Sequence, residues 1–219
     1  MSVALAAIGN NIGIVASDSI SCSPEGEVSY NCNKTFRLKR FPVIGAYVGR
    51  LEFSEKGIPD HLDEILGVSK HKSMLSVVES IKVGMSERLS RSGASDCKVE
   101  IILLGRKNLE KDGILQIYTL EFKHTYDPNT TDQFKLDSFA GKGACAHTGD
   151  GKARELIESY FQKNSSALQA DNLSLLKLKI KNIMETAIIG CGDCSDFPDL
   201  RACGLPVSVR LLEEQKKHH

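Results

Sequence analysis

The chain has 219 residues, of which 41% are hydrophobic and 26% are charged, and this composition excludes an intrinsically disordered chain. The 28 Lys and Arg residues balance the 28 Asp and Glu residues, so we expect no bulk attraction to nucleic acid or to an anionic membrane. No apolar run approaches the roughly 18 residues of a membrane-spanning helix. The seven scattered cysteines and the lack of a secretory signal pattern predict a cytoplasmic location.

The first half of the chain predicts a β-hairpin, two further short strands and a helical block. Gly9-Asn10-Asn11 forms turns readily and separates two apolar runs, which indicates the hairpin. After residue 57 the apolar residues recur at helical spacing, with a break at Gly67-Val68-Ser69. The segments are Val3–Ile8 and Ile12–Ala16 for the hairpin, Lys34–Leu38 and Val43–Val48 for the strands, and Ile58 to about Leu89 for the helices.

The second half predicts strands, then two helices, then a last strand. Thr148 or Asp150 is a suitable cap for the first of these helices. No internal repeat or linker divides the chain, so we expect a single domain over residues 1–219, with a disordered tail from about residue 213. Strands interleaved with paired helices predict two layers of sheet with helices outside, an α+β fold. The segments are Val99–Leu104, Ile114–Phe122, Phe134–Ala140, Leu205–Leu212 for strands, and Thr148–Phe161 and Leu173–Ile189 for helices.

Ser2 directly follows the initiator Met1. Methionine aminopeptidases accept a small second residue, so we expect the mature chain to begin at Ser2. An N-terminal serine carries a hydroxyl nucleophile and, as its own general base, an α-amine whose pKa is close to neutral pH. Many cytosolic proteins begin with Met-Ser, however, so this feature does not indicate catalysis by itself.

The spacing of three other residues strengthens the case for Ser2. Asp18 lies sixteen residues after Ser2, at the end of the second predicted strand, and Lys34 lies sixteen residues after Asp18, at the start of the third. If these strands are neighbours, both side chains converge beside the N-terminus. Gly49 follows the fourth strand, where its backbone N–H can face an oxyanion. The ordinary alternatives are a turn or cap aspartate, a solvated lysine and a turn glycine.

This pattern resembles the proteasome β-type subunits and their bacterial relatives, within the N-terminal nucleophile hydrolases. The matching motifs are the hydroxyl residue Ser2, Ser17-Asp18-Ser19, Lys34 at the start of the third strand, and Val48-Gly49. Two later segments are similar to the family's Gly-Ser-Gly strand-to-helix junction and to its Gly-Asp after the last long helix. They are Ala140-Gly141-Lys142-Gly143-Ala144-Cys145-Ala146 and Ile189-Gly190-Cys191-Gly192-Asp193. The chain departs from the family in having Ser2 where threonine is usual and Lys142 in place of the junction serine.

The resemblance implies a four-layer αββα sandwich and peptide-bond cleavage through an acyl-enzyme on Ser2. In such a site the charge of Lys34 lowers the pKa of the Ser2 α-amine, and Asp18 pairs with Lys34. The backbone N–H of Gly49 binds the oxyanion, and Asp193 fixes the amine or a water. The resemblance also implies a homo-oligomer, either a ring or a helical assembly, which encloses the sites and receives peptides or unfolded proteins from an ATP-dependent unfoldase. The substrate-binding residues implied are Ser21, Cys22 and Tyr47.

Two other functions compete with this one: a small-molecule amidase of the same mechanism, and a proteasome-type structural subunit without activity. We expect no cofactor and no metal. Cys191-x-x-Cys194 with Cys203 lacks a fourth ligand at zinc spacing, and Gly141-Lys142-Gly143 lacks the spacing of a phosphate loop.

Overall fold

The chain alternates runs of strands with pairs of helices. The computed structural model describes residues 2–10, 12–22, 28–29, 32–49, 56–91, 97–111, 113–124, 133–149, 151–163, 172–190 and 205–213. Along these residues the elements, in chain order, are β1 (Val3–Ile8), β2 (Ile12–Ser17), β3 (Ser21–Cys22), β4 (Val28–Ser29), β5 (Thr35–Arg37), β6 (Ile44–Gly49), α1 (Ile58–Leu66), α2 (Met74–Arg91), β7 (Cys97–Arg106), β8 (Leu115–His124), β9 (Gln133–Ala140), β10 (Cys145–Gly149), α3 (Gly151–Lys163), α4 (Leu173–Gly190) and β11 (Ser208–Glu213).

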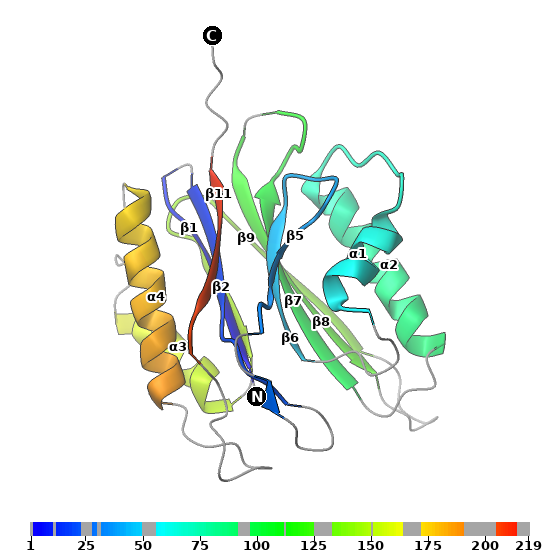
Figure 1. Ribbon diagram of the computed structural model, residues 1–219. Helices are drawn as coiled ribbons and strands as arrows, with labels where there is room; N and C mark the ends of the chain where they lie inside the picture. The colour runs from blue at the N-terminus through cyan, green and yellow to red at the C-terminus, as the bar shows by residue number, and fades with distance from the viewer. Residues whose placement is uncertain are drawn as a thin grey trace.

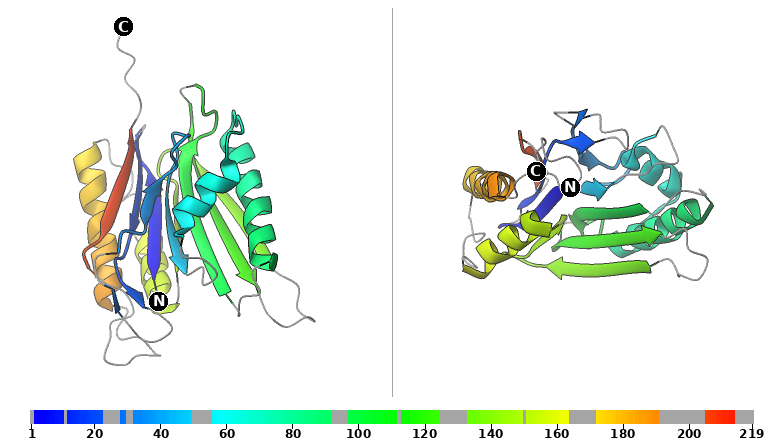
Figure 2. Two further views of the ribbon diagram at one scale, coloured as in Figure 1. Left: turned by 45° about the vertical axis from the view of Figure 1, so that its right-hand side comes forward. Right: turned by 90° about the horizontal axis from the view of Figure 1, so that it is seen from below.

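Two antiparallel sheets pack face to face between two pairs of helices (Figures 1 and 2). The first sheet has the order β10-β1-β2-β11 and the second β5-β6-β7-β8-β9, while β3 and β4 form a separate two-stranded ribbon. One apolar cluster joins α3 and α4 to the first sheet, a second joins α1 and α2 to the second sheet, and a third fills the space between the sheets. The predicted α+β fold, a four-layer αββα sandwich, is therefore confirmed.

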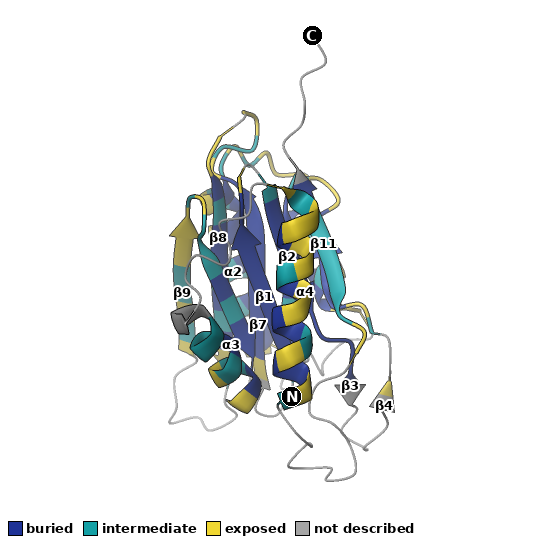
Figure 3. Ribbon diagram, turned by 90° about the vertical axis from the view of Figure 1, so that its left-hand side faces the viewer, coloured by how far each residue is buried: buried dark blue, intermediate teal, exposed yellow. Residues whose placement is uncertain are grey.

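Strand β1 is buried on both faces (Figure 3). Because side chains alternate along a strand, Leu5 faces the helix layer of α3 and α4, whereas Ala4 and Ala6 face the second sheet. The turn that joins β1 to β2 is closed by Gly9 N, which donates to the carbonyl of Ile12 over 2.8 Å. The near-continuous apolar sequence of the predicted hairpin thus reflects a central position with a layer on each side.

The helical block is divided where the sequence predicts a break. Helix α1 begins with Pro59 in its first turn and ends at Gly67, whose φ of 47° is unfavourable for residues with a Cβ. The next helix, α2, begins after Ser73, whose Oγ accepts a hydrogen bond from Ser76 N at 3.2 Å and so caps the helix. Both helices bury one apolar face against the second sheet.

Two predictions for residues 140–161 are wrong. The segment Ala140–Ala146 does not join a strand to a helix, because β9 is followed by β10, and Lys142 is an exposed residue of the turn between them. Thr148 does not cap a helix, because it lies in β10 and pairs with Ala4 of β1. The sequence of β10, Cys-Ala-His-Thr-Gly, is short and partly polar, so only its pairing with β1 makes it a strand. The strand-to-helix junction lies instead between Gly149 and Gly151.

Some other predictions fall at the limits of the described residues. Strand β11 begins at Ser208, three residues later than predicted, and the β3–β4 ribbon was not predicted. The following residues lie outside the described part of the chain: Asp150, Cys191, Asp193, Cys194, Cys203 and residues 214–219.

Candidate active site

The hairpin of β1 and β2 places Ser2 beside Asp18. Ser2 directly precedes β1 and Asp18 directly follows β2, and the two strands are antiparallel. Val3 N donates to Asp18 Oδ1 at 3.0 Å, and Ile20 N donates to Asp18 Oδ2 at 3.2 Å. The Asp18 side chain is fully buried, so these two amides replace part of its lost hydration and fix the direction of its carboxylate.

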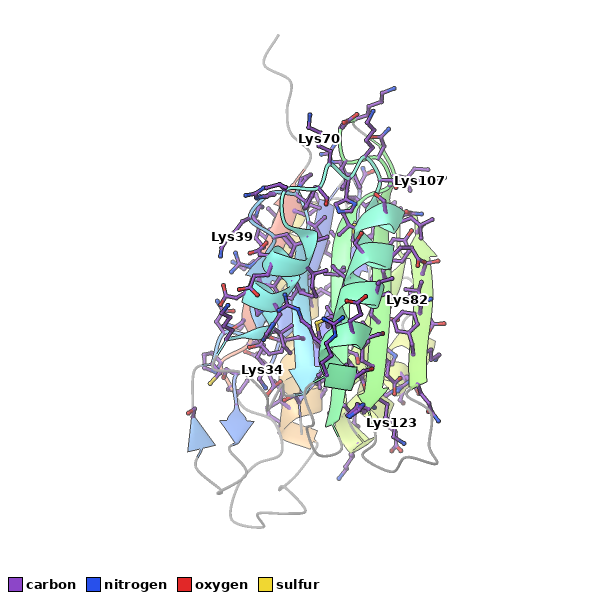
Figure 4. The ribbon with its side chains drawn as sticks, turned by 90° about the vertical axis from the view of Figure 1, so that its right-hand side faces the viewer. Lys34, Lys39, Lys70, Lys82, Lys107 and Lys123 are labelled. Carbon is purple, nitrogen blue, oxygen red and sulfur yellow. The ribbon has the colours of Figure 1, made fainter. Side chains whose placement is uncertain are left out.

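Lys34 reaches this pair from the second sheet. It lies one residue before β5, and its Nζ is 3.2 Å from each carboxylate oxygen of Asp18 and 2.6 Å from Ser2 Oγ. The same ammonium donates to the carbonyl oxygen of Ile20. Lys34 is only 5% exposed and lies in the lower half of the molecule in Figure 4. The three residues that the sequence spaces sixteen apart therefore meet at one point between the two sheets.

The electrostatics of this cluster favour negative charge on the Ser2 hydroxyl oxygen. A protonated lysine has three N–H donors and no acceptor, so Lys34 can only donate to Ser2 Oγ. Hydrogen bonds from an ionised donor are stronger than those between neutral groups, and burial weakens the screening by water. The cluster can therefore stabilise an alkoxide-like oxygen at Ser2, as a nucleophile needs.

Gly49 ends β6 on the same side as Lys34. Tyr47 N donates to the carbonyl of Lys34 over 3.2 Å, and because N–H directions repeat every second residue in a strand, the N–H of Gly49 faces that same edge of β6. Gly49 has a φ of 91°, and a Cβ there would lie 2.1 Å from the carbonyl oxygen of Lys98. Only glycine fits this position, and it leaves the amide unobstructed.

The structure places the predicted substrate-binding residues in two different settings. Tyr47 is half-buried on the face of β6 that points to α1 and α2, with its ring centroid 6.4 Å from that of Phe36. Burial, reinforced by the nearby Cys32, raises the pKa of the Tyr47 hydroxyl above its usual value. Ser21 and Cys22 form β3, but their side chains lie outside the described set.

Two residues near Ser2 were not predicted from the sequence. Gly149 pairs with Val3 and has a φ of 137°, and a Cβ on it would lie 2.4 Å from the Ser2 carbonyl oxygen. Its N–H donates to Oε2 of the buried Glu100 at 3.0 Å. A signal for Glu100 exists in the sequence, because it occupies an inward position in the otherwise apolar strand around Ile102. No sequence signal distinguishes Gly149 from other turn glycines.

Within the described residues, no group of three or more His, Cys, Asp and Glu side chains is placed to hold a metal ion. Of the helices described, none combines the length and the apolarity needed to cross a bilayer. Asp193 cannot be placed relative to Ser2, since it lies outside the described residues.

No family model and no curated protein matches this chain. Solved structures do share its fold. The Gly-1 mutant of Anbu from Hyphomicrobium sp. strain MC1 has a TM-score of 0.60 at 10% identity, over 100% of this chain and 90% of that one. BPH from Thiobacillus denitrificans, a bacterial proteasome homologue, has a TM-score of 0.53 at 11% identity, over 96% of this chain and 97% of that one. The complex of BPH with epoxomicin has a TM-score of 0.52 at 12% identity, over 96% of this chain and 98% of that one.

At this level of identity the likeness concerns the path of the chain, and it extends over nearly the whole length of each protein. It agrees with the two sheets packed between two pairs of helices. The chain therefore has the fold of the proteasome-type peptidases.

Proposed function

We propose that this chain is an N-terminal nucleophile hydrolase that cleaves peptide bonds, with Ser2 as the nucleophile. The observation that carries the proposal is the 2.6 Å hydrogen bond from Lys34 Nζ to Ser2 Oγ, within a buried ion pair with Asp18. The carboxylate of Asp18 already compensates the buried charge of Lys34. A purely structural ion pair would not need the additional hydrogen bond from Lys34 to the Ser2 hydroxyl, so this bond points to a role in chemistry.

The first chemical step follows from these contacts once the bond between Met1 and Ser2 has been cleaved. The free α-amine of Ser2 accepts the proton of its own hydroxyl, and Oγ forms a bond to the substrate carbonyl carbon. The Lys34 ammonium stabilises the negative charge that develops on Oγ, and the N–H of Gly49 accommodates the oxyanion of the tetrahedral intermediate. Asp18 keeps the ammonium directed at Oγ.

The second half of the reaction returns the enzyme to its starting state. The protonated amine gives its proton to the departing nitrogen, the C–N bond breaks, and an ester on Ser2 remains. Water then attacks the ester with the amine as base, which releases the acid product and restores the hydroxyl. In the proposal Asp193 fixes the amine or the water, and Ser21, Cys22 and Tyr47 bind the substrate.

The fold supports the proposed setting of this activity. The chain shares its architecture with the Thiobacillus denitrificans BPH, one structure of which holds epoxomicin. We accordingly propose a cytoplasmic homo-oligomer, a ring or a helical assembly, which encloses the Ser2 sites and takes peptides or unfolded proteins, with an ATP-dependent unfoldase as partner. No cofactor enters the mechanism.

The test combines intact mass with covalent labelling. The purified wild type should have lost one methionine and should react with a peptide epoxyketone, which needs a hydroxyl and a free amine on one residue, and with a β-lactone, which needs the hydroxyl. Ser2→Ala should react with neither. Ser2→Thr is the matched control, because it keeps both groups and adds only a methyl that restricts χ1.

The outcomes separate the competing functions. Equal labelling of wild type and Ser2→Ala would remove Ser2 from the mechanism. A retained methionine with no labelling would leave a structural subunit without activity. Labelling by the β-lactone together with turnover of small amides, but of no peptide, would indicate a small-molecule amidase.

A further inference from the structure

A buried carboxylate lies between the two sheets, beside their apolar contact and at the wall of a cavity of about 460 Å³. Glu100 of β7 is 4% exposed, and it projects from the same face of the strand as Ile102 and Leu104, which are fully buried. Burying a charged group is costly unless it is paired and hydrogen-bonded, and an apolar residue of similar volume often serves stability as well. The contacts of Glu100 therefore indicate what it does.

Glu100 supplies an acceptor that the first sheet cannot supply. Val3 uses both of its backbone groups towards β2, since its N–H donates to Asp18 Oδ1 at 3.0 Å and its carbonyl accepts from Asp18 N at 3.1 Å. Gly149, its partner in β10, is thus left without an acceptor in β1, and β10 is the edge strand of the sheet. Its N–H instead donates to Glu100 Oε2 at 3.0 Å. A side chain of the second sheet thereby holds the edge of the first.

Gly149 transmits this constraint to Ser2. The Ser2 carbonyl oxygen lies so close to Gly149 that a Cβ on the glycine would be 2.4 Å from it. The position of Gly149 therefore limits where the Ser2 backbone can lie, and a shift of Gly149 would allow the Ser2 backbone to move. The hydroxyl of Ser2 has to remain within 2.6 Å of Lys34 Nζ, which is a contact between the two sheets.

The charge of Glu100 is balanced by Lys98. Lys98 Nζ pairs with Glu100 and lies 3.4 Å from Glu121, which is directly opposite Glu100 in the register of β7 and β8. Facing carboxylates destabilise a sheet, so the lysine between them offsets their repulsion. The carbonyl oxygen of Lys98 also packs against Gly49. One short stretch of β7 thus contacts both glycines that flank the proposed site.

We infer that Glu100 is a positioning residue, which holds Gly149 and so keeps the chain end at Ser2 in register with Lys34. This inference rests on the proposed function for its catalytic consequence, although the positioning itself does not depend on activity. The reach of the carboxylate to Gly149 matters more than its charge, because the contact with Gly149 is a hydrogen bond to a backbone amide.

The experiment contrasts two conservative variants of Glu100 in the full chain. Glu100→Gln keeps the length and an acceptor oxygen but removes the charge, whereas Glu100→Asp keeps the charge beside Lys98 but is one methylene too short to reach Gly149. Glu121→Gln is the control, because it removes a charge from the same network without contacting Gly149. The readouts are amide hydrogen exchange at Val3 and Gly149, measured by NMR, and the rate of labelling by a β-lactone.

We expect Glu100→Asp to speed exchange at Val3 and Gly149 by about tenfold or more, as the loss of one buried hydrogen bond predicts. The maximal labelling rate should fall by a similar factor while the concentration for half-maximal labelling stays unchanged. Glu100→Gln and Glu121→Gln should stay within about threefold of wild type in both readouts.

Unchanged exchange at Val3 and Gly149 in Glu100→Asp would overturn the inference, as would a larger effect from Glu100→Gln than from Glu100→Asp. A wild type that no probe labels would contradict the proposed function instead, and the exchange data would still decide whether Glu100 positions the chain end. If exchange responds as expected but labelling of Glu100→Asp equals that of wild type, the catalytic consequence is wrong.

Discussion

Two lysines on either side of β5 form ion pairs of very different kinds. Lys34 pairs with Asp18 between the sheets, where the two side chains are 6% and 0% exposed. Lys39 pairs with Asp60 at 3.4 Å on the surface beside α1, where the side chains are 71% and 57% exposed. Figure 4 shows both lysines, with Lys39 above Lys34 at the side of the molecule. The residue types are the same and the surroundings differ.

Burial makes one pair a candidate for chemistry, whereas exposure to water makes the other pair a surface interaction only. Water competes for both partners of the surface pair, so such pairs contribute about 0–1 kcal/mol and hold no fixed geometry. The buried pair has lost its water and is held by backbone amides on the Asp18 side. Its ammonium can therefore present one N–H to Ser2 Oγ in a constant direction, as positioning for catalysis requires.

Removing Asp18 should have the largest effect on stability. Asp18→Ala leaves the Lys34 ammonium buried without its carboxylate and leaves the amides of Val3 and Ile20 without acceptors. We expect the free energy of unfolding to fall by about 3–5 kcal/mol, measured by urea denaturation. Asp60→Ala, the surface counterpart, should change it by less than about 0.5 kcal/mol. Similar losses in both variants would show that burial does not distinguish the two pairs.

Replacing both members of the buried pair separates stability from activity. Lys34→Met alone should lower the rate of β-lactone labelling by at least about a hundredfold and also destabilise the protein. In the double variant Lys34→Met with Asp18→Leu, most of the lost stability should return, because no buried charge is left unpaired. Labelling should stay low. Recovery of labelling in the double variant would exclude Lys34 from the mechanism.

Gly49 and Gly141 form a matched pair for testing the end of β6. Their φ angles are 91° and 89°, but a Cβ on Gly49 would meet the Lys98 carbonyl oxygen at 2.1 Å, whereas one on Gly141 would meet nothing within 4 Å. Gly141→Ala should cost about 1 kcal/mol of stability from its backbone angle alone. Gly49→Ala should cost more than about 2 kcal/mol and slow labelling. Equal costs by chemical denaturation would show that the contact with Lys98 is relaxed in solution.

A smaller effect is expected from pH at His147, which lines a cavity of about 460 Å³ between β10, α3 and the second sheet. Burial lowers the pKa of His147 below its usual 6.5, while Glu158 raises it and Arg154 lowers it further. The unfolded chain then binds a proton more readily than the folded one, so the contribution of His147 is complete above pH 6.5 and is lost as the pH falls below it. His147→Gln should lose less stability than wild type on acidification, as followed by thermal unfolding. The same acid dependence in both proteins would contradict this.

The long elements could be predicted from the sequence because their signals are local. The period of the apolar residues identified the central hairpin and the helices α1, α2 and α4, and Gly67 marked the break between the first two. β10 escaped prediction for the opposite reason, because its five residues are partly polar and become a strand only beside β1. The strand-to-helix junction was placed at Lys142 because β10 was missed, whereas the helix begins only after β10, at Gly151.

The candidate site divides in the same way. Ser2, Asp18 and Lys34 could be proposed from their spacing together with the family resemblance, because each lies next to one end of a predicted strand. The charge of Glu100 within an apolar strand could be noticed in the sequence, but its contact with Gly149 could not be proposed, because the two residues meet only across the gap between two sheets.

The periods of the strands and helices and the residue types at the strand ends follow from the amino-acid sequence, since they depend on near neighbours along the chain. Which side chains lose contact with water, and which backbone amides need a partner from another layer, follows only from the folded arrangement. Desolvation and contacts between layers depend on residues far apart in the chain. For that reason the Lys34–Asp18 pair differs from the pair at Lys39, although the sequence presents both as a lysine and an aspartate.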